Sequence, residues 1–372
     1  MDSATDAAPA LDDRDLVLNF ESVGDNCELG LVQRHVGAEP LGLLRFSGAP
    51  LRSLLRALAN RFHGIADPAS IRIHEENGEY MVKLTQYDFY YHAHIKAGEA
   101  TPETLHAQQT RTVRFLTDKL ISDLETPSKI LVFRQNEPLM ATDLVDLRVA
   151  LSAYGPNTLL WVQEACPGHP PGSVTVADER LIVGYVNRLA PREDVPNLHL
   201  RSWLSVLRAA HAIWLLPEPD RVQAGREATA RMRRVDLSFG TDGNARPHLG
   251  IGWSGPEAGY QWAVGERSLI TLPNLGPAEE YWLEMDVIPY VSPPLLPRQR
   301  LDVSVNGSFV KSFDPAPRGQ LYCTIPGNLI ADGEAVKLLL DHPFAASPIL
   351  VAGGRDDRRL AFSFSRLSMM AV

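Results

Sequence analysis

The strongest constraint on the fold of this chain is a change in the spacing of its apolar residues near Pro217 and Pro219. Before this point, short apolar runs alternate with segments of helical period; after it, short strand-like runs follow one another between loops rich in proline and glycine. Alternating strands and helices predict a mostly parallel α/β sheet, whereas successive short strands predict a β-sandwich. A chain of 372 residues is long enough for both.

These patterns predict four segments along the chain. Residues 1–14 are expected to form a disordered tail, residues 15–218 an α/β domain with Rossmann-like layers, residues 219–234 a linker helix and residues 235–372 a jelly-roll-like β-sandwich. Strands are expected at 16–20, 130–133, 158–162 and 181–186, and helices at 51–62, 101–124, 143–153 and 202–214. Sandwich strands are expected at 268–272, 281–288, 301–305, 309–313, 321–325, 336–340 and 360–367.

The composition is that of a soluble globular protein, with 45% hydrophobic and 22% charged residues. A net charge of −9 and the lack of a basic stripe argue against nucleic acid as a partner. No apolar run reaches the ~20 residues of a membrane helix, and the first residues do not resemble a secretory signal. Three distant cysteines at 27, 166 and 323 do not predict a disulfide framework, which favours the cytoplasm. No motif predicts a cofactor or the oligomeric state.

One turn stands out as a candidate site. The apolar run at residues 16–20 predicts a buried strand, and Leu29, Val32 and Val36 have the spacing of a helix. Between them lies the polar turn Ser-Val-Gly-Asp-Asn-Cys at 22–27. Open α/β sheets build their sites at such turns, because unpaired N–H groups at the helix start face the crevice. Gly24 is therefore a predicted substrate-binding position.

The residue types at this turn fit a cysteine nucleophile. A cysteine at a helix start has a stabilised thiolate, so Cys27 is the predicted nucleophile, and His92 or His94 is the predicted base. In an extended strand Asp88 shares a face with both histidines and can orient them. Asn26 and the turn N–H groups would hold the oxyanion. The alternative is that the cysteine and the histidines are structural.

Three other interpretations use some of the same residues. His92 and His94, with Asp88, have a spacing that can ligate zinc, but the same spacing is more often that of a solvent-facing polar edge; we therefore predict no metal. Arg134 can hold the phosphate of a nucleotide sugar in a glycosyltransferase-like domain. Ser22 and Asn136 resemble the nucleophile and oxyanion positions of SGNH-type esterases, although the Gly-Asp-Ser order and a late Asp-x-x-His are absent.

The segment of about residues 16–215 resembles a bacterial family of unknown function labelled papain-like cysteine peptidases. The shared features are Ser-x-Gly-x-x-Cys at 22–27, Leu-Arg-Phe at 44–46, Tyr-Asp-Phe at 87–89, the helix around 111–115 and Ile-Leu-Val-Phe-Arg at 130–134. The resemblance implies Cys27 as nucleophile and His92 or His94 as base. Where that family commonly has Pro-Phe-Asp-Trp, this chain has Leu-Leu-Arg-Phe at 43–46.

The second half resembles sandwich domains found beside bacterial polysaccharide glycosyltransferases. The segments that carry this are 252–257, 260–262, 305–307 and 357–360. Trp253 and Trp262 are predicted to stack on sugar rings and Glu257 to bind hydroxyls, unless both tryptophans fill the core. Together, the two halves predict a Cys/His hydrolase or acyl transferase that acts on a surface glycan or glycoconjugate. The alternative is a non-catalytic carbohydrate-binding accessory protein.

Overall fold

The computed structural model describes residues 11–190 and 194–372, which divide into two compact units. Unit 1 comprises residues 1–165 and 171–229, and unit 2 comprises residues 166–170 and 230–372. The chain mixes helices and sheets, with a β-sandwich in unit 2. Most of the predicted tail lies outside the described residues. The predicted end of the tail at residue 14 is wrong, because a helix already begins at Asp13. Asp12 caps this helix by accepting a hydrogen bond from the N–H of Asp15 (2.7 Å).

Unit 1 contains seven α-helices and nine β-strands within the described residues. The helices are α1 (Asp13–Val17), α2 (Glu28–His35), α3 (Leu51–Ala59), α4 (Pro102–Glu125), α5 (Ala141–Ser152), α6 (Leu200–Trp214) and α7 (Glu218–Ala230). The strands are β1 (Phe20–Ser22), β2 (Ser47–Gly48), β3 (Ile71–Glu76), β4 (Glu79–Leu84), β5 (Phe89–Lys96), β6 (Ile130–Phe133), β7 (Thr158–Glu164), β8 (Val174–Asp178) and β9 (Leu181–Val186).

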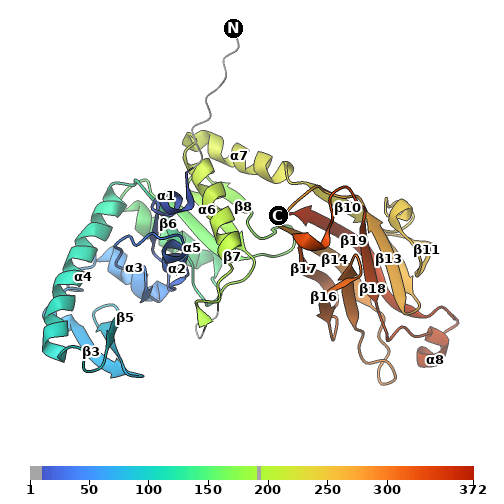
Figure 1. Cartoon of the computed structure of the whole chain (residues 1–372), viewed down its shortest axis with the longest axis horizontal. Helices are drawn as coiled ribbons and strands as arrows, with labels where there is room; N and C mark the ends of the chain where they lie inside the picture. Colours follow the sequence, from blue (N-terminus) through green and yellow to red (C-terminus); the bar gives the residue numbers. More distant parts are fainter. Residues whose placement is uncertain (1–10, 191–193) are drawn as a thin grey trace, which may run out of the picture. The chain divides into compact units, whose positions relative to one another are not determined.

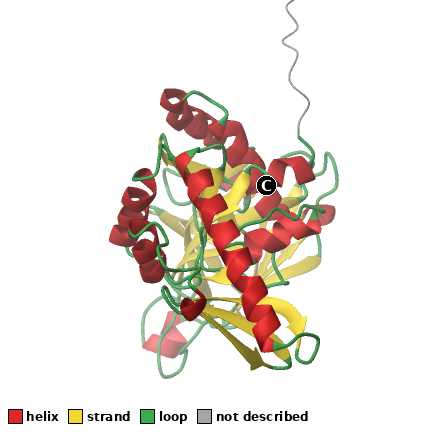
Figure 2. Cartoon of the chain, turned by 90° about the vertical axis from the view of Figure 1, so that its left-hand side faces the viewer, coloured by secondary structure: helices red, strands yellow, loops and turns green. Residues whose placement is uncertain are grey.

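The main sheet of unit 1 has the strand order β1-β6-β7-β9-β8. The first three contacts are parallel, and the edge strand β8, which the sequence did not predict, pairs antiparallel with β9. Side chains of β6 alternate between two apolar clusters: Ile130 and Val132 pack with α1, α2 and α6, and Leu131 and Phe133 pack with α3, α4 and α5. Helices therefore cover both faces of the sheet (Figure 2).

The first strand is shorter than predicted. Leu16 and Val17 lie in α1 and are buried there, and the strand begins only at Phe20. An apolar run of this length fits a buried helix as well as a buried strand, and the cap at Asp12 decides for the helix.

A second sheet in unit 1 has the order β2-β5-β4-β3 and is antiparallel throughout. Asn77 and Gly78 join β3 to β4 in a hairpin, with positive φ angles of 51° and 79°. Helix α4 lies beside β3 (Figure 1). Thr101 caps α4 by accepting a hydrogen bond from the N–H of Thr104 (3.3 Å).

Unit 2 consists of two antiparallel sheets, in the orders β11-β12-β19-β14-β17 and β13-β18-β15-β16, with β10 also paired to β19 (Figure 1). The strands are β10 (Arg234–Ser238), β11 (Trp253–Glu257), β12 (Tyr260–Val264), β13 (Arg267–Leu272), β14 (Glu280–Pro289), β15 (Leu301–Val305), β16 (Ser308–Phe313), β17 (Gly319–Pro326), β18 (Val336–Asp341) and β19 (Leu360–Ala371). A short helix, α8 (Pro348–Ala352), precedes β19.

The seven strands predicted for this half are confirmed, whereas β10, β11 and β12 were not predicted. In strand β14, for example, every second residue points into the core: Tyr281, Leu283, Met285 and Val287. The sandwich is therefore held by one shared apolar core.

Candidate functional site

The turn after β1 is held against the strand β6. The N–H of Val23 donates to the carbonyl of Val132 (2.9 Å), and the N–H of Asp25 donates to that of Arg134 (2.9 Å). Between them Gly24 approaches so closely that a Cβ there would lie 2.4 Å from the Arg134 carbonyl oxygen. Gly24 therefore serves backbone packing, and it permits the turn to end at the carboxyl ends of both strands.

This turn delivers several predicted residues to one pocket of about 150 Å³. Cys27 is the residue before the first turn of α2, and Asn26 accepts a hydrogen bond from the N–H of Glu28 (2.7 Å). His92 reaches the pocket from β5, and Asn136 reaches it from the loop after β6. The complete lining is Asp25, Asn26, Cys27, Phe46, Ser47, Gly48, Tyr90, Tyr91, His92, Asn136 and Val195.

The amide of Asn136 has one unused donor. Its oxygen accepts a hydrogen bond from Arg134 Nη1, while its nitrogen Nδ2 is buried without an acceptor among the described residues. A buried amide donor without an acceptor is destabilising unless a ligand or water supplies one. Asn136 is therefore the lining group best suited to receive a ligand oxygen.

A buried ion pair, which was not predicted from the sequence, lies beside this pocket. Arg134 Nε lies 2.5 Å from Glu28 Oε2; Glu28 is fully buried, and Arg134 is 3% exposed. The same two side chains bind the backbone of Ala190, since its N–H donates to Glu28 Oε1 (2.7 Å) and its carbonyl accepts from Arg134 Nη2 (2.9 Å). The predicted phosphate-binding role of Arg134 is wrong, because its guanidinium is already paired.

The thiol of Cys27 is not activated by its surroundings. Burial raises its pKa to about 11, and the negative charges of Asp25 and Glu28 outweigh the opposing effect of Arg134. The expected stabilisation of the thiolate by the helix start is thus wrong, because burial of the thiol, together with the nearby carboxylates of Asp25 and Glu28, outweighs it. Cys27 is a neutral thiol at neutral pH.

The histidines are oriented by a different carboxylate from the one predicted. His92 Nδ1 lies 3.1 Å from Glu79 Oε2, and His94 Nδ1 lies 3.6 Å from Glu79 Oε1. Asp88 instead pairs with Lys83 (2.6 Å), because it precedes β5 with a φ of +60° and stands outside the alternation of the strand.

His94 is not part of the pocket lining. Its φ of +56° interrupts the alternation, and its ring packs edge-on against Phe46 at a centroid distance of 6.2 Å. Ser22 also stays outside the lining, since it is a buried residue of β1 that pairs with Val132. Within the described residues, no group of three or more His, Cys, Asp or Glu side chains is arranged to hold a metal ion.

In unit 2 the two predicted tryptophans point in opposite directions. Trp253 pairs across the strands with Ala263, which is fully buried in the core, and therefore faces inward with it. Its ring contacts Phe239 and Phe364 at centroid distances of 5.3 and 5.2 Å, and its Nε1 donates to the carbonyl of Leu269 (3.0 Å). The predicted sugar-binding role of Trp253 is wrong.

Trp262 faces the outside of the sandwich, because its neighbours Gln261 and Ala263 are buried on the inner face. Its ring lies perpendicular to those of Tyr260 and Tyr290, at a centroid distance of 6.1 Å from each. We call Tyr260, Trp262 and Tyr290 the aromatic cluster.

Polar groups border the aromatic cluster. Tyr260 donates its hydroxyl hydrogen to Glu257 (2.6 Å), and this hydrogen bond raises the pKa of Tyr260. Arg358 donates to the other oxygen of Glu257 (3.3 Å) and is itself held by Asp356 (2.6 Å). Sugar hydroxyls are bound by carboxylates and guanidinium groups of this kind when an aromatic ring lies beside them.

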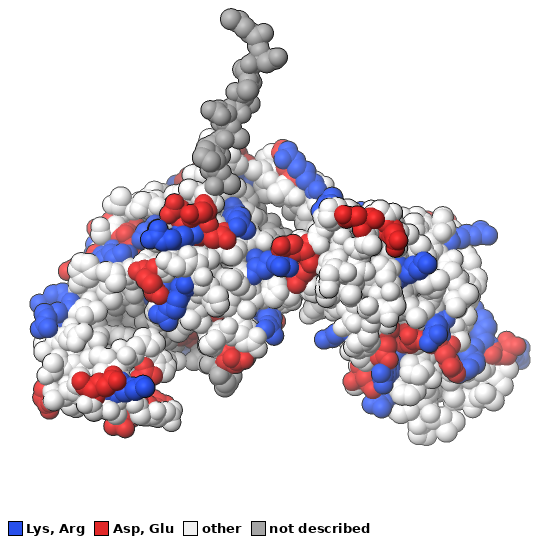
Figure 3. Space-filling model, viewed as in Figure 1, with Lys and Arg blue, Asp and Glu red and all other residues white. Residues whose placement is uncertain are grey.

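The face shown in Figure 3 has no dominant charge of one sign, because basic and acidic side chains are interspersed on it. Within the described residues, no helix combines the length and hydropathy needed to cross a membrane.

No family model matches the chain, and no curated protein sequence matches it. Among solved structures, it is similar to the C-terminal CBM6 of LamC, a marine laminarinase from Zobellia galactanivorans, with 11% identity over 37% of this chain and 98% of that chain and a TM-score of 0.24. It is also similar to the CBM36-1 domain of a xylanase from the hindgut metagenome of Trinervitermes trinervoides, with 10% identity over 37% of this chain and 98% of that chain and a TM-score of 0.20. A third similar structure is the C-terminal domain of EclA, a sugar-binding protein, with 13% identity over 37% of this chain and 77% of that chain and a TM-score of 0.18. TM-scores this low do not establish a common fold or a common function.

Proposed function

We propose that this protein binds carbohydrate through the outer face of its sandwich unit, at the aromatic cluster. The observation that carries the proposal is the placement of Trp262, which faces outward between two perpendicular tyrosine rings and beside the Glu257–Arg358 pair. An indole held in this way offers a flat apolar surface to the C–H face of a sugar ring. The neighbouring carboxylate and guanidinium groups supply acceptors and donors for its hydroxyls.

The strand pairing places Trp262 and Ile288 on the same outer face of the sheet. Trp262 pairs with Ser363 of β19, and Ser363 pairs in turn with Ile288 of β14. Ser363 itself is buried, whereas Ile288 is exposed beside it. This arrangement favours a glycan chain lying along the sheet, as in recognition of a surface polysaccharide or glycoconjugate.

The test is a titration of the full chain with cello-, xylo- and laminari-oligosaccharides, followed by tryptophan fluorescence and calorimetry. We expect at least one series to bind and Trp262→Ala to weaken it by at least about fivefold. Phe309→Ala is the matched control, because Phe309 is an exposed aromatic residue on the other sheet. Unchanged affinity in Trp262→Ala, or no binding by any series, would contradict the proposal.

A second candidate function is supported by the pocket that Cys27, His92 and Asn136 share. We propose acyl transfer or hydrolysis there, with the pocket at the carboxyl ends of parallel strands as in doubly wound sheets. Because Glu79 lies at Nδ1 of His92, Nε2 is the nitrogen left to accept the Cys27 proton. The thiolate would then attack the acyl carbon while Asn136 Nδ2 donates to the oxyanion.

The remaining steps of this candidate balance without a cofactor. The bond to the leaving oxygen breaks, and the imidazolium returns its proton to that oxygen. Water then hydrolyses the thioester and regenerates the thiol. The raised pKa of Cys27 disfavours this chemistry, which is why carbohydrate binding is the first proposal.

The acyl-transfer candidate is tested with p-nitrophenyl acetate as the probe. If it holds, the full chain releases a burst of p-nitrophenol that Cys27→Ala abolishes. Cys166→Ala is the matched control, because Cys166 is also a free and partly exposed cysteine but does not line the pocket. A burst that survives in Cys27→Ala, or no burst at all, excludes this function and leaves the carbohydrate proposal unaffected.

A further inference from the structure

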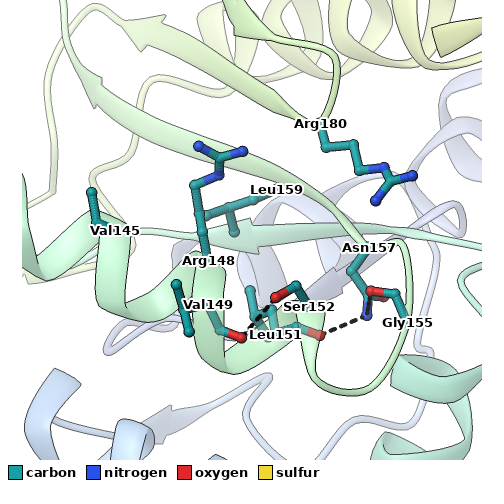
Figure 4. A pocket seen from close by; sticks show the side chains of 9 residues that line it. All are labelled: Val145, Arg148, Val149, Leu151, Ser152, Gly155, Asn157, Leu159 and Arg180. Atoms are coloured by element: carbon teal, nitrogen blue, oxygen red, sulfur yellow. Dashed lines mark hydrogen bonds between the residues drawn. The ribbon is translucent and has the colours of Figure 1, made fainter.

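A second cavity of unit 1, of about 260 Å³, lies at the other end of the main sheet. It is enclosed by α5, by the turn before β7 and by the turn between β8 and β9 (Figure 4). Because β6 and β7 are parallel and β7 begins at Thr158, this cavity lies at the amino ends of the strands. The pocket at Cys27 lies at the carboxyl ends of β1 and β6, so the two sites are separate.

Asn157 gives this cavity a fixed hydrogen-bond acceptor. Its Nδ2 donates to the carbonyl oxygens of Leu124, Leu151 and Gly155, at 2.9, 3.2 and 3.3 Å. All three partners are acceptors, so the amide cannot be flipped. Its Oδ1 is buried without a donor among the described residues, and the residue as a whole is only 9% exposed. A buried acceptor of this kind is destabilising until a ligand or water donates to it.

Two arginines line the cavity, and each is paired with a carboxylate (Figure 4). Arg148 makes a two-pronged pair with Asp178 (2.7 and 2.9 Å), and Arg180 makes one with Glu218 (3.0 and 3.0 Å). Asp178 also accepts a hydrogen bond from the N–H of Arg180 (3.0 Å), which ties the turn to α5. Because both charges are compensated, the cavity does not select an anion. The planar guanidinium faces are suited to aromatic rings.

The remaining lining is largely apolar. Val145 and Val149 lie one turn apart on α5 and are 56% and 64% exposed, while Leu151 and Leu159 are buried in the core of unit 1. Figure 4 shows both valines on the helix that borders the cavity. An apolar body can therefore cover these valines beside Asn157.

We propose that this cavity is a binding site for a small, uncharged aromatic molecule that carries an N–H group. The N–H donates to Asn157 Oδ1, and the ring lies against Val145, Val149 and the guanidinium groups. This site is independent of carbohydrate binding by unit 2.

The test uses indole and 1-methylindole, which share an aromatic body but differ in the N–H group. Titration of the full chain, followed by ligand-observed NMR, is expected to show indole binding with a Kd of roughly 1 mM or below, and 1-methylindole binding about tenfold more weakly. Val149→Trp fills the opening and is expected to remove indole binding. Val291→Trp changes another exposed valine, which lies in unit 2, and should leave binding unchanged.

Equal affinities for the two probes would overturn the proposal, because the hydrogen bond to Asn157 would then contribute nothing. Indole binding that persists in Val149→Trp would also overturn it, since the ligand would lie elsewhere. Absence of binding by either probe would mean that water alone fills the cavity. Thermal unfolding of both tryptophan variants verifies that they are folded.

Discussion

The pocket at Cys27 and the surface at Trp262 were both predicted from residue types. The structure brings predicted residues together at the first position and separates them at the second. At Cys27, two residues 109 positions apart, Cys27 and Asn136, line the same pocket, because the turn after β1, the strand β5 and the loop after β6 converge there. At Trp262, two tryptophans only nine positions apart separate onto opposite faces of one sheet. Residues that are distant in the sequence thus meet in a site because of the sheet topology. The face to which a side chain points depends instead on its position in the alternation along its own strand.

The two regions also differ in what burial does to their chemistry. Burial raises the pKa of the Cys27 thiol and keeps it protonated, while Trp262 faces outward beside the Glu257–Arg358 pair. Four measurements test these differences.

The largest effect is expected from Arg134→Met, which leaves the fully buried Glu28 without its partner. We expect the free energy of unfolding to fall by about 3–5 kcal/mol in urea denaturation. The double variant Arg134→Met, Glu28→Leu should recover most of this loss, because it removes both charges. A single variant as stable as the wild type would show that the pair does not hold the Cys27 turn in place.

Trp253→Ala should destabilise the sandwich by about 3 kcal/mol, because it opens a cavity against Phe239 and Phe364. Trp262→Ala should lower the free energy of unfolding by only about 1 kcal/mol or less, and it should weaken carbohydrate binding instead. Urea denaturation of the two variants checks the first part of this contrast. If the two stability losses were reversed, the assignment of inner and outer faces would be wrong.

Cys27 should be alkylated by iodoacetamide at pH 7 roughly a hundredfold more slowly than free cysteine, because an ordinary thiol has a pKa of about 8.5. The rate should keep rising up to about pH 11, the pKa of Cys27. A raised pKa favours the protonated thiol of the folded state. The contribution of the protonated Cys27 thiol to the free energy of unfolding is therefore present below pH 9 and is lost as the pH rises through about 11.

Mass spectrometry of the peptide that contains Cys27 measures this alkylation rate. Alkylation faster than that of free cysteine at pH 7 would reverse our ranking and favour the acyl-transfer candidate.

The smallest effect is expected from Asp88→Asn. This variant removes a surface ion pair with Lys83 and should change the free energy of unfolding by about 0.5 kcal/mol or less. Glu79→Gln is the informative partner variant, because Glu79 lies beside both histidines. The NMR chemical shifts of the His92 ring should respond to Glu79→Gln and not to Asp88→Asn. The opposite response would restore Asp88 as the orienting carboxylate.

Much of the fold could be predicted from the sequence, because the spacing of apolar residues is a local signal. The strand β6, the helix α4 and the seven predicted sandwich strands have clear periods or caps and are confirmed. The strands β8 and β11 were missed, because β8 is a short antiparallel edge strand and β11 carries glycine and proline. The sequence suggested Cys27 and His92 for one site, but it could not show a charge pair between Glu28 and Arg134, which arises only when β1 and β6 align.

The division of the chain has a practical consequence for anyone who wants to study the sandwich alone. Residues 166–170 belong to unit 2, although the chain on both sides of them belongs to unit 1. A single cut near residue 230 therefore yields a fragment that lacks five residues of its own compact unit. One of these is Gly168, whose N–H binds Glu284 on β14 (2.8 Å). Supplying the missing loop as a separate peptide, or fusing it to the fragment, is the way to obtain the whole sandwich.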